Sequence, residues 1–332
     1  MTVMRAVVLT KPGTPDTFTL VSDQPIPKPK AGEIRVRVHA AGLNPVDYKL
    51  AMNGHPNWEY PFVPGVDVAG VVDEVGEGVK QWYIGDRVVY HGDFSKPGGF
   101  AEYSITTAHT VAAIPDDVSF EDAAAFPCAG LTAYQVIFRK MHMSAGQSIL
   151  IHAGSGGVGG YAIQLAKLCG ASKIITTASP QNEEYVRSLG ADIVLDYNTV
   201  DVYTEVMSLT EGRGVDLILN SVNRATAQKD LSMLSFGGQL ACIAGAPETV
   251  ADFQPSTKTF TLHKLMLGGA HGSGNRKEEE DLPIMMEHFL SLMVEKKIDP
   301  LVKQVISLDD IPYGLKQLSE KHVQGKIVAR IS

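Results

Sequence analysis

The chain has 332 residues, 44% of them hydrophobic and 20% charged, a composition that is typical of a folded globular protein and excludes a disordered or fibrous one. Because this length exceeds the usual size of one hydrophobic core, we expect two domains. The formal net charge is −8 and no Lys/Arg cluster is present, so nucleic acid is excluded as an expected partner.

The N-terminal apolar run at residues 6–9 is typical of the start of a strand and is too short for a signal peptide. No later segment reaches the length of a transmembrane helix. The cysteines Cys128, Cys169 and Cys242 lie far apart and form no C-x-x-C pair, so we interpret them as reduced thiols. We therefore expect a cytoplasmic protein that is not embedded in a membrane.

Residues 1–125 are rich in Gly, Pro and short β-branched runs. Residues 34–39 alternate between apolar and polar side chains, which predicts a half-buried strand. Residues 66–72 and 86–90 predict further strands between turns that contain glycine. Short strands at this spacing favour an antiparallel barrel or sandwich.

The pattern changes near residue 126, where apolar strands begin to alternate with stretches of helical periodicity. The predicted strands are 148–153, 174–177, 193–195, 215–219 and 239–243. Strands that are apolar throughout and separated by helices predict a parallel sheet covered on both faces, and hence the α/β class. After about residue 265 the alternation weakens, and we predict helices at 278–296 and 309–322 with strands at 302–306 and 326–331. The acidic run Glu278–Asp281 is interpreted as a solvated helix start.

Directly after the strand 148–153 the chain reads Ala-Gly-Ser-Gly-Gly-Val-Gly over residues 153–159, which contains G-x-G-x-x-G before a helix. This is the context that a dinucleotide-binding loop requires. Residues without a Cβ let the backbone approach a pyrophosphate, whose charge then faces a helix N-terminus. A tight strand-to-helix turn without a ligand is the alternative.

The end of the next strand bears on the choice of dinucleotide. An NAD site usually carries an Asp or Glu about 20 residues after the glycine motif, where it binds the ribose hydroxyls. Here the strand ends in Ala178 and Ser179, and the first carboxylate is Glu183. An acid would repel a 2′-phosphate, so its absence favours NADPH over NADH. Ser179 is a candidate phosphate ligand with Asn182 and Tyr197 as candidate neighbours, and a helix N-cap at Ser179 is the alternative.

A series of motifs in fixed order covers nearly the whole chain. They are Ala40–Lys49 (AAGLNPVDYK), Pro64–Gly70 (PGVDVAG), Gly85–Val88 (GDRV), Gly98–Tyr103 (GGFAEY), Gly130–Tyr134 (GLTAY), Gln164–Lys167 (QLAK) and Gly325–Val328 (GKIV). With these motifs the chain resembles the medium-chain dehydrogenase/reductase superfamily, and within it the zinc-independent quinone oxidoreductase branch.

The resemblance implies a GroES-like β-barrel catalytic domain over residues 1–125, a Rossmann doubly wound domain over 126–265, and a return to the catalytic domain over 266–332. It implies that Thr132 contacts the nicotinamide side of the cofactor, and that main-chain groups at Gly245 and Ala246 face the carboxamide. Two departures weaken the match: Asn220 stands where relatives often carry Asp, and Asn182 where several NADPH-dependent relatives carry Lys. The predicted cofactor-binding residues are Thr132, Gly154, Ser155, Gly156, Gly157, Val158, Gly159, Ser179, Asn182, Tyr197, Ser221, Gly245 and Ala246.

The sequence also predicts that no metal is bound. Zinc members of the superfamily carry a Cys in an early loop and a Gly-His-Glu segment after it, where this chain has Asn44 and Gly65–Asp67. The four closely spaced cysteines of a structural zinc lobe are missing as well. A catalytic zinc needs about three protein ligands, and Asp67 beside the scattered His39 and His91 does not supply them.

Without zinc, hydrogen bonds have to polarise the substrate carbonyl. The family places the loop that contains Asn44, Asp47, Tyr48 and Lys49 near the nicotinamide, and the first three are the candidate catalytic residues. Tyr48 is the candidate proton donor. A purely structural role as an aromatic pocket wall, with water as the donor, is the alternative.

We therefore expect a zinc-independent, NADPH-dependent oxidoreductase that transfers a hydride to a quinone or an α,β-unsaturated carbonyl. We expect a homodimer, with a tetramer as the alternative. Two other functions stay open, a zinc-type alcohol dehydrogenase and a non-catalytic NADPH-binding sensor on the same fold.

Overall fold

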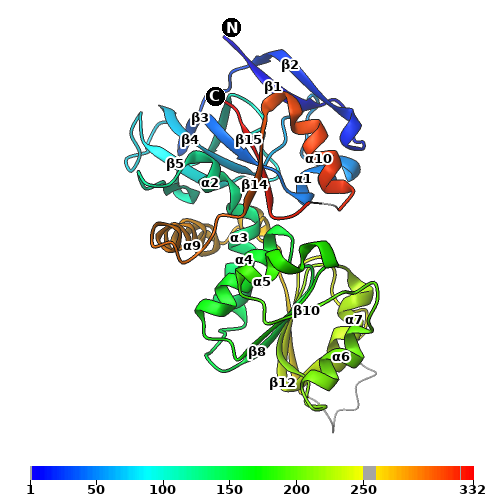
Figure 1. Ribbon diagram of the computed structural model, residues 1–332. Coiled ribbons are helices and arrows are strands. Elements are labelled where there is room, and N and C mark those ends of the chain that lie inside the picture. The colour runs from blue at the N-terminus through cyan, green and yellow to red at the C-terminus, as the bar shows by residue number, and fades with distance from the viewer. Residues whose placement is uncertain (1, 250–258, 322) are drawn as a thin grey trace. The chain divides into compact units, whose positions relative to one another are not determined.

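The computed structural model describes residues 2–249, 259–321 and 323–332. Its internal contacts divide the chain into two compact units, one formed by Met1–Leu131 with Leu267–Ser332 and the other by Thr132–Met266. Figure 1 shows both units with their helices and strands labelled. Within the described residues, no helix is both long and apolar enough to cross a membrane.

The first unit is built on a sheet whose strands come from both ends of the chain. The strand order is β14-β15-β3-β4-β5-β7, with β6 also paired to β3. The strands are β3 (Glu33–Gly42), β4 (Asp67–Val75), β5 (Arg87–His91), β6 (Tyr103–Thr107), β7 (Ala112–Ala113), β14 (Val302–Ser307) and β15 (Lys326–Arg330). All neighbours are antiparallel except β14 and β15, which are parallel. A separate hairpin joins β1 (Val3–Leu9) to β2 (Phe18–Pro25).

The predicted alternation along β3 determines which of its side chains enter the core. Ile34, Val36 and Val38 are fully buried and pack in one cluster with residues of β4 and β5. Arg35, on the other face, forms an ion pair with Asp73 of β4. The prediction of antiparallel strands in this region is therefore confirmed.

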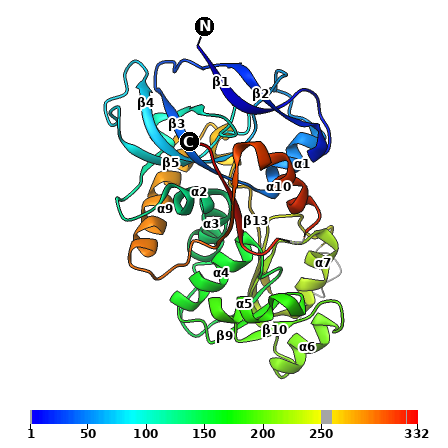
Figure 2. The ribbon, with the colours of Figure 1, turned by 45° about the horizontal axis from the view of Figure 1, so that its top comes forward.

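The described residues of the first unit also form the α-helices α1 (Pro45–Asn53), α2 (Phe120–Ala125), α3 (Pro127–Tyr134, which runs into the second unit), α8 (Gly269–Gly272), α9 (Arg276–Val294) and α10 (Ile311–Ser319). Helices α1 and α10 pack side by side, as Figure 2 shows. The interpretation of Glu278–Asp281 as a wholly solvated start of α9 is wrong for Glu279. This side chain is partly buried and bonds to the His109 ring at 2.5 Å.

The prediction of a loop at residues 44–49 is also wrong, because α1 begins at Pro45. Asn44 is the N-cap residue, and proline is favoured in the first turn because its missing N–H would have no helical partner there. The carboxylate of Asp47 accepts a hydrogen bond from the Asn44 backbone N–H at 2.8 Å, which fixes the helix start.

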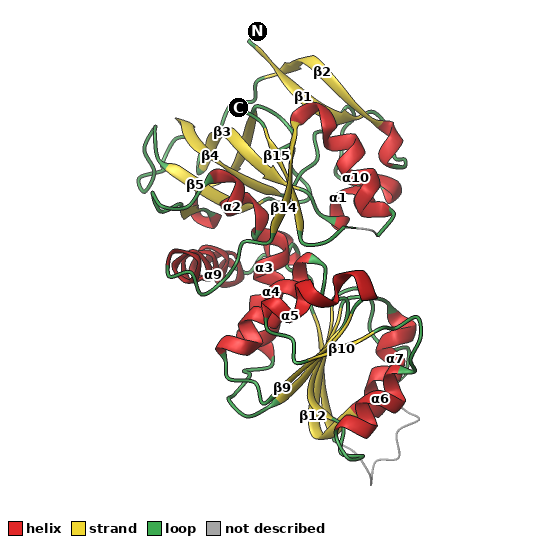
Figure 3. Ribbon diagram, in the orientation of Figure 1, coloured by secondary structure: helices red, strands yellow, loops and turns green. Residues whose placement is uncertain are grey.

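The second unit is a six-stranded parallel sheet in the order β10-β9-β8-β11-β12-β13. The strands are β8 (Ser148–Ile151), β9 (Lys173–Thr177), β10 (Ile193–Leu195), β11 (Val215–Asn220), β12 (Leu234–Cys242) and β13 (Phe260–Lys264). In Figure 3, α4 (Gly157–Leu168) and α5 (Glu183–Leu189) lie on one side of this sheet, and α6 (Val202–Leu209) and α7 (Arg224–Met233) on the other. The predicted doubly wound α/β architecture is confirmed, and its order reverses between β8 and β11.

Candidate functional site

The glycine loop connects β8 to α4, and its glycines have different reasons to be glycine. A Cβ on Gly154 would lie 2.0 Å from the Thr176 hydroxyl, and one on Gly159 would lie 2.3 Å from the Ala153 carbonyl oxygen. Both glycines are therefore needed for the packing of the turn itself. Among the described residues, a Cβ on Gly156 would meet only the Ala153 oxygen, at 3.6 Å. The backbone is thus open at Gly156, which is the N-cap of α4, and this open helix N-terminus fits a pyrophosphate.

The other predicted cofactor residues follow the ends of neighbouring strands. Ser179 and Asn182 follow β9, Tyr197 follows β10, Ser221 follows β11, and Gly245 follows β12. Because the strands are parallel, all these positions lie at one edge of the sheet together with the glycine loop. Ala246 comes directly after Gly245, whereas Thr132 is placed on α3 with its side chain buried.

At the end of β9 the polar side chains bond to each other. The Asn182 side-chain amide donates to the Ser179 hydroxyl at 3.1 Å. Leu195 pairs with Thr177 in the parallel register, so Tyr197 and Ser179 each lie two residues beyond a paired position. Tyr197 is 57% exposed, and Ala178 is 2% exposed. No carboxylate lies between Thr177 and Asn182, so the segment that directly follows β9 has no acid to repel a 2′-phosphate. Asp196 follows the neighbouring strand β10, beside Ala178 in the register.

Sequence reasoning missed a buried polar network beneath the same edge. The His152 ring bonds to the Asp230 carboxylate at 2.8 Å, and Asn220 donates to the other Asp230 oxygen at 2.6 Å. The Thr177 hydroxyl lies 3.4 Å from His152 and accepts the Ala153 N–H at 3.0 Å. The network joins the start of the glycine loop to the ends of β9 and β11. The sequence signal that could have revealed this network is the polar residue at the end of each strand, Thr177 in β9 and Asn220 in β11.

The candidate catalytic residues lie in the first unit, around a buried ion pair. The Asn44 side-chain amide donates to the Asp67 carboxylate at 2.7 Å. Its oxygen accepts a hydrogen bond from the Lys326 ammonium at 2.5 Å, and the same ammonium donates to the Leu43 carbonyl at 3.0 Å. Lys326 and Asp67 lie 3.8 Å apart. Asn44 is therefore fixed between a cation and an anion.

Asp47 and Tyr48 follow Asn44 in the first turn of α1. Burial raises the pKa of the Asp47 carboxyl to about 8, and the neighbouring Asp67 carboxylate adds to the rise. One Asp47 oxygen has no hydrogen-bond partner among the described residues. A cavity of about 20 Å³ that Asp47 helps to line has room for one water. Tyr48 is 7% exposed, and burial raises the pKa of its hydroxyl.

The description of His39 and His91 as scattered is wrong for His91. In the antiparallel pairing of β4 with β5, Asp67 lies directly opposite His91. Cys128, at the start of α3, completes a group in which one ligand atom of each residue lies within 4.8 Å of the others. His39 lies elsewhere and stacks on Phe120 at 4.4 Å.

The donor set of Asp67, His91 and Cys128 nevertheless does not fit a zinc ion. Both Asp67 oxygens already accept hydrogen bonds, one from the Cys128 backbone N–H at 2.8 Å and one from Asn44. Burial raises the pKa of the Cys128 thiol well above its usual value, which disfavours the thiolate that zinc binds. The Lys326 ammonium lies 3.8 Å from the Asp67 carboxylate and would repel a metal ion bound there.

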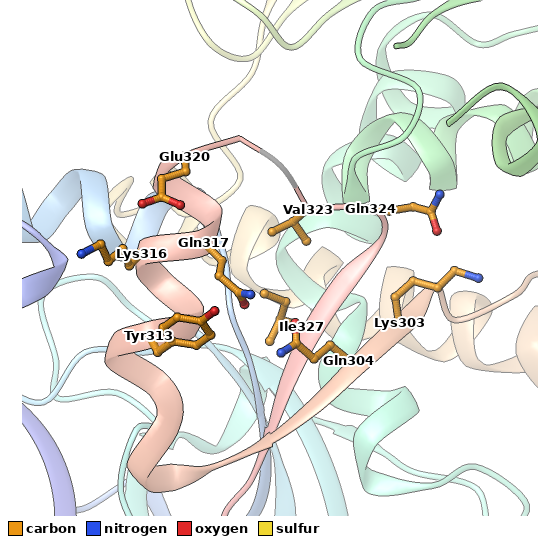
Figure 4. A pocket seen from close by; sticks show the side chains of 9 residues that line it. All are labelled: Lys303, Gln304, Tyr313, Lys316, Gln317, Glu320, Val323, Gln324 and Ile327. Carbon is orange, nitrogen blue, oxygen red and sulfur yellow. The ribbon is translucent and has the colours of Figure 1, made fainter. Parts of the chain in front are cut away.

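A separate groove of about 410 Å³ lies on the first unit among α10, β14 and β15 (Figure 4). Ile327 lines this groove, whereas Lys326 precedes it on β15 and points to the opposite face of the sheet. None of the predicted site residues is among the described residues that line the groove. The groove and the buried ionic cluster are therefore different places in the unit.

Two family models match the chain. The alcohol dehydrogenase GroES-like domain covers residues 30–116, and the zinc-binding dehydrogenase model covers residues 157–290. The quinone oxidoreductase of Homo sapiens is 33% identical over 72% of this chain and 73% of its own length. The solved structure of the CurK enoyl reductase is 26% identical with a TM-score of 0.84 and covers 99% of both chains.

A mycobacterial protein solved in complex with NADPH is 29% identical, with a TM-score of 0.86 over 98% of this chain and 99% of its own. The matches in sequence and in fold thus extend over both units of the chain. The chain belongs to the medium-chain dehydrogenase/reductase superfamily, where it is an oxidoreductase related to the quinone oxidoreductases.

Proposed function

We propose that this protein is a zinc-independent, NADPH-dependent reductase of quinones or α,β-unsaturated carbonyls. The observation that carries the proposal is the strand edge of the second unit. There the segment after β9 that contains Ala178 and Ser179 offers a hydroxyl and an amide, and no acid lies between Thr177 and Asn182. The NADPH complex of a structural relative and the quinone oxidoreductase relatives support the same assignment.

The chain's own residues divide the binding of the dinucleotide among them. The backbone at Gly156 and the first turn of α4 would hold the pyrophosphate. Ser179 and Asn182 would donate hydrogen bonds to a 2′-phosphate, while Ser221 and Gly245 would bind towards the nicotinamide. When bound, the nicotinamide supplies a hydride donor.

The proposed substrates follow from the proposed zinc independence, which rests on the donor set around Asp67. A conjugated carbonyl or a quinone accepts a hydride at carbon and spreads the resulting charge to oxygen, so it needs less polarisation than an isolated carbonyl. We propose that the Tyr48 hydroxyl donates a hydrogen bond to that oxygen. Asn44 and Asp47 then act from the buried side, since both hold the first turn of α1 in place.

We also propose a homodimer formed at the β13 edge. Among the described strands β13 pairs only with β12, so its outer edge is unpaired. Nearby apolar side chains are exposed: Phe236 by 74%, Leu262 by 36% and Met266 by 74%. Pairing of two β13 strands would extend the sheet and cover them. Sedimentation of the wild type and of Leu262→Lys tests this, and an unchanged dimer in the variant contradicts the location. Among the described residues the three cysteines form no disulfide, which supports our proposal of a cytoplasmic location.

Steady-state assays of the chelator-treated protein test the function. A quinone, an alkenal and a simple alcohol would each be assayed with both dinucleotides. We expect turnover of the quinone or the alkenal with NADPH, unchanged by EDTA. Alcohol oxidation that EDTA abolishes and zinc restores would instead identify a zinc-type alcohol dehydrogenase. Tight NADPH binding without turnover of any substrate would favour a sensor.

A further inference from the structure

We propose that the Lys326 ammonium takes the place of a catalytic metal ion in this chain, and that its charge keeps the group Asp67–His91–Cys128 from binding one. The inference deepens the zinc-independent part of the proposed function. Its test measures metal binding without turnover, so that it can succeed or fail separately from the assignment of substrate and cofactor.

Contacts of the ammonium resemble those of a bound cation. It lies with 3% of the residue exposed, surrounded by the Asn44 amide oxygen at 2.5 Å, the Leu43 carbonyl at 3.0 Å and the Asp67 carboxylate at 3.8 Å. Three oxygen atoms around one buried positive charge are the kind of environment that a hard cation occupies. Two N–H groups of this buried ammonium donate to Asn44 and Leu43. Lys326 therefore acts through Asn44 and Asp67 and not as a direct substrate contact.

The charges around this cation balance without a metal. Asp67 and Lys326 are both buried, and the carboxylate faces the ammonium at 3.8 Å. The carboxylate therefore already has a buried cation beside it. A divalent ion added to this balanced pair would leave a large net charge in a buried site.

The neighbouring ligand set is nevertheless present. His91 is fully buried, and neither of its ring nitrogens has a hydrogen-bond partner among the described residues. A carboxylate, an imidazole and a thiol within 4.8 Å of one another are the three ligand types that zinc uses. The ligands for a metal are therefore present, and the Lys326 ammonium beside them is what keeps a metal from binding.

Cobalt(II) titration of the metal-free, full-length protein tests the proposal, because cobalt bound to a thiolate gives visible and charge-transfer absorption. The wild type should show no absorption that depends on Cys128. Lys326→Met should bind one cobalt per chain, at least about 100-fold more tightly than the wild type, because the repulsion is gone. The thiolate band should disappear in Lys326→Met/Cys128→Ser. Lys326→Arg, which keeps the charge, and Lys303→Met, which removes a lysine from the neighbouring strand, should behave as the wild type does.

Thermal unfolding, followed by circular dichroism with and without cobalt, covers the case in which Lys326→Met is unstable. Loss of the ammonium leaves Asp67 buried without a counterion, so the variant should unfold at a lower temperature and recover when cobalt is added. A wild type that already binds cobalt through Cys128 overturns the proposal. So does a folded Lys326→Met that binds no more tightly, or an unfolded one that cobalt does not rescue.

Discussion

Replacing Gly156 with valine should abolish dinucleotide binding and leave the fold intact. The structure distinguishes this glycine from its neighbours. Gly156 has φ −83° and ψ 176°, an extended conformation that valine adopts readily. Among the described residues, a Cβ there would meet only the Ala153 oxygen, at the ordinary contact distance of 3.6 Å. We therefore expect the free energy of unfolding to change by less than about 1 kcal/mol.

The expected loss of binding is much larger than that. The branched side chain would project from the open N-terminus of α4, where the backbone has to approach the pyrophosphate. We expect the Kd for NADPH to rise at least about 100-fold, which corresponds to roughly 2.7 kcal/mol. Titration calorimetry gives the Kd, and thermal unfolding of the same samples shows whether the protein is folded.

Gly154→Ala is the matched control, because it adds a methyl group to the same loop at a position where we expect the fold, and not the open helix N-terminus, to be disturbed. Its Cβ would lie 2.0 Å from the Thr176 hydroxyl inside the turn. Such overpacking costs about 1–3 kcal/mol, so this variant should lose stability whether or not NADPH is present. A folded Gly156→Val that binds NADPH with the affinity of the wild type would refute the assignment of the glycine loop, and with it the proposed cofactor site.

Three further predictions concern the segment after β9 and the cluster at α1. Wild-type kcat/KM for NADPH should exceed that for NADH by at least about tenfold, roughly 1.4 kcal/mol. Ala178→Asp should reverse the preference, and a folded variant that still prefers NADPH would place the phosphate elsewhere. Tyr48→Phe should lower kcat with little effect on the Kd for NADPH, whereas an unchanged kcat would make Tyr48 a pocket wall. Since the pKa of folded Asp47, about 8, lies above the usual 3.8, the wild type should lose stability relative to Asp47→Asn as pH rises from about 4 to 8. Urea unfolding at several pH values measures this, and a pH-independent difference would contradict it.

Much of the architecture could be predicted because the signals are local. In the second unit, a run such as Ser148–Ile151 is buried on both faces, so its lack of alternation already indicates a covered parallel strand. The glycine loop is similar, because its geometry depends on residues within a single turn. Strand β13 went unpredicted although Phe260–Lys264 alternates between apolar and polar side chains, because the run is only five residues long and none of them is fully buried.

The helix start at Asn44 was also local, yet it was overlooked: the Asn-Pro-Val-Asp segment at residues 44–47 carries a capping pattern that was interpreted as part of a loop. By contrast, the buried ionic cluster depends on contacts that no local pattern contains. Lys326 reaches Asn44 across 282 positions of the chain because β15 pairs with β3. Asp67 meets His91 through the register of β4 on β5. Register is set by how whole strands bury their apolar faces, so only the tertiary structure decided which charges of the first unit meet.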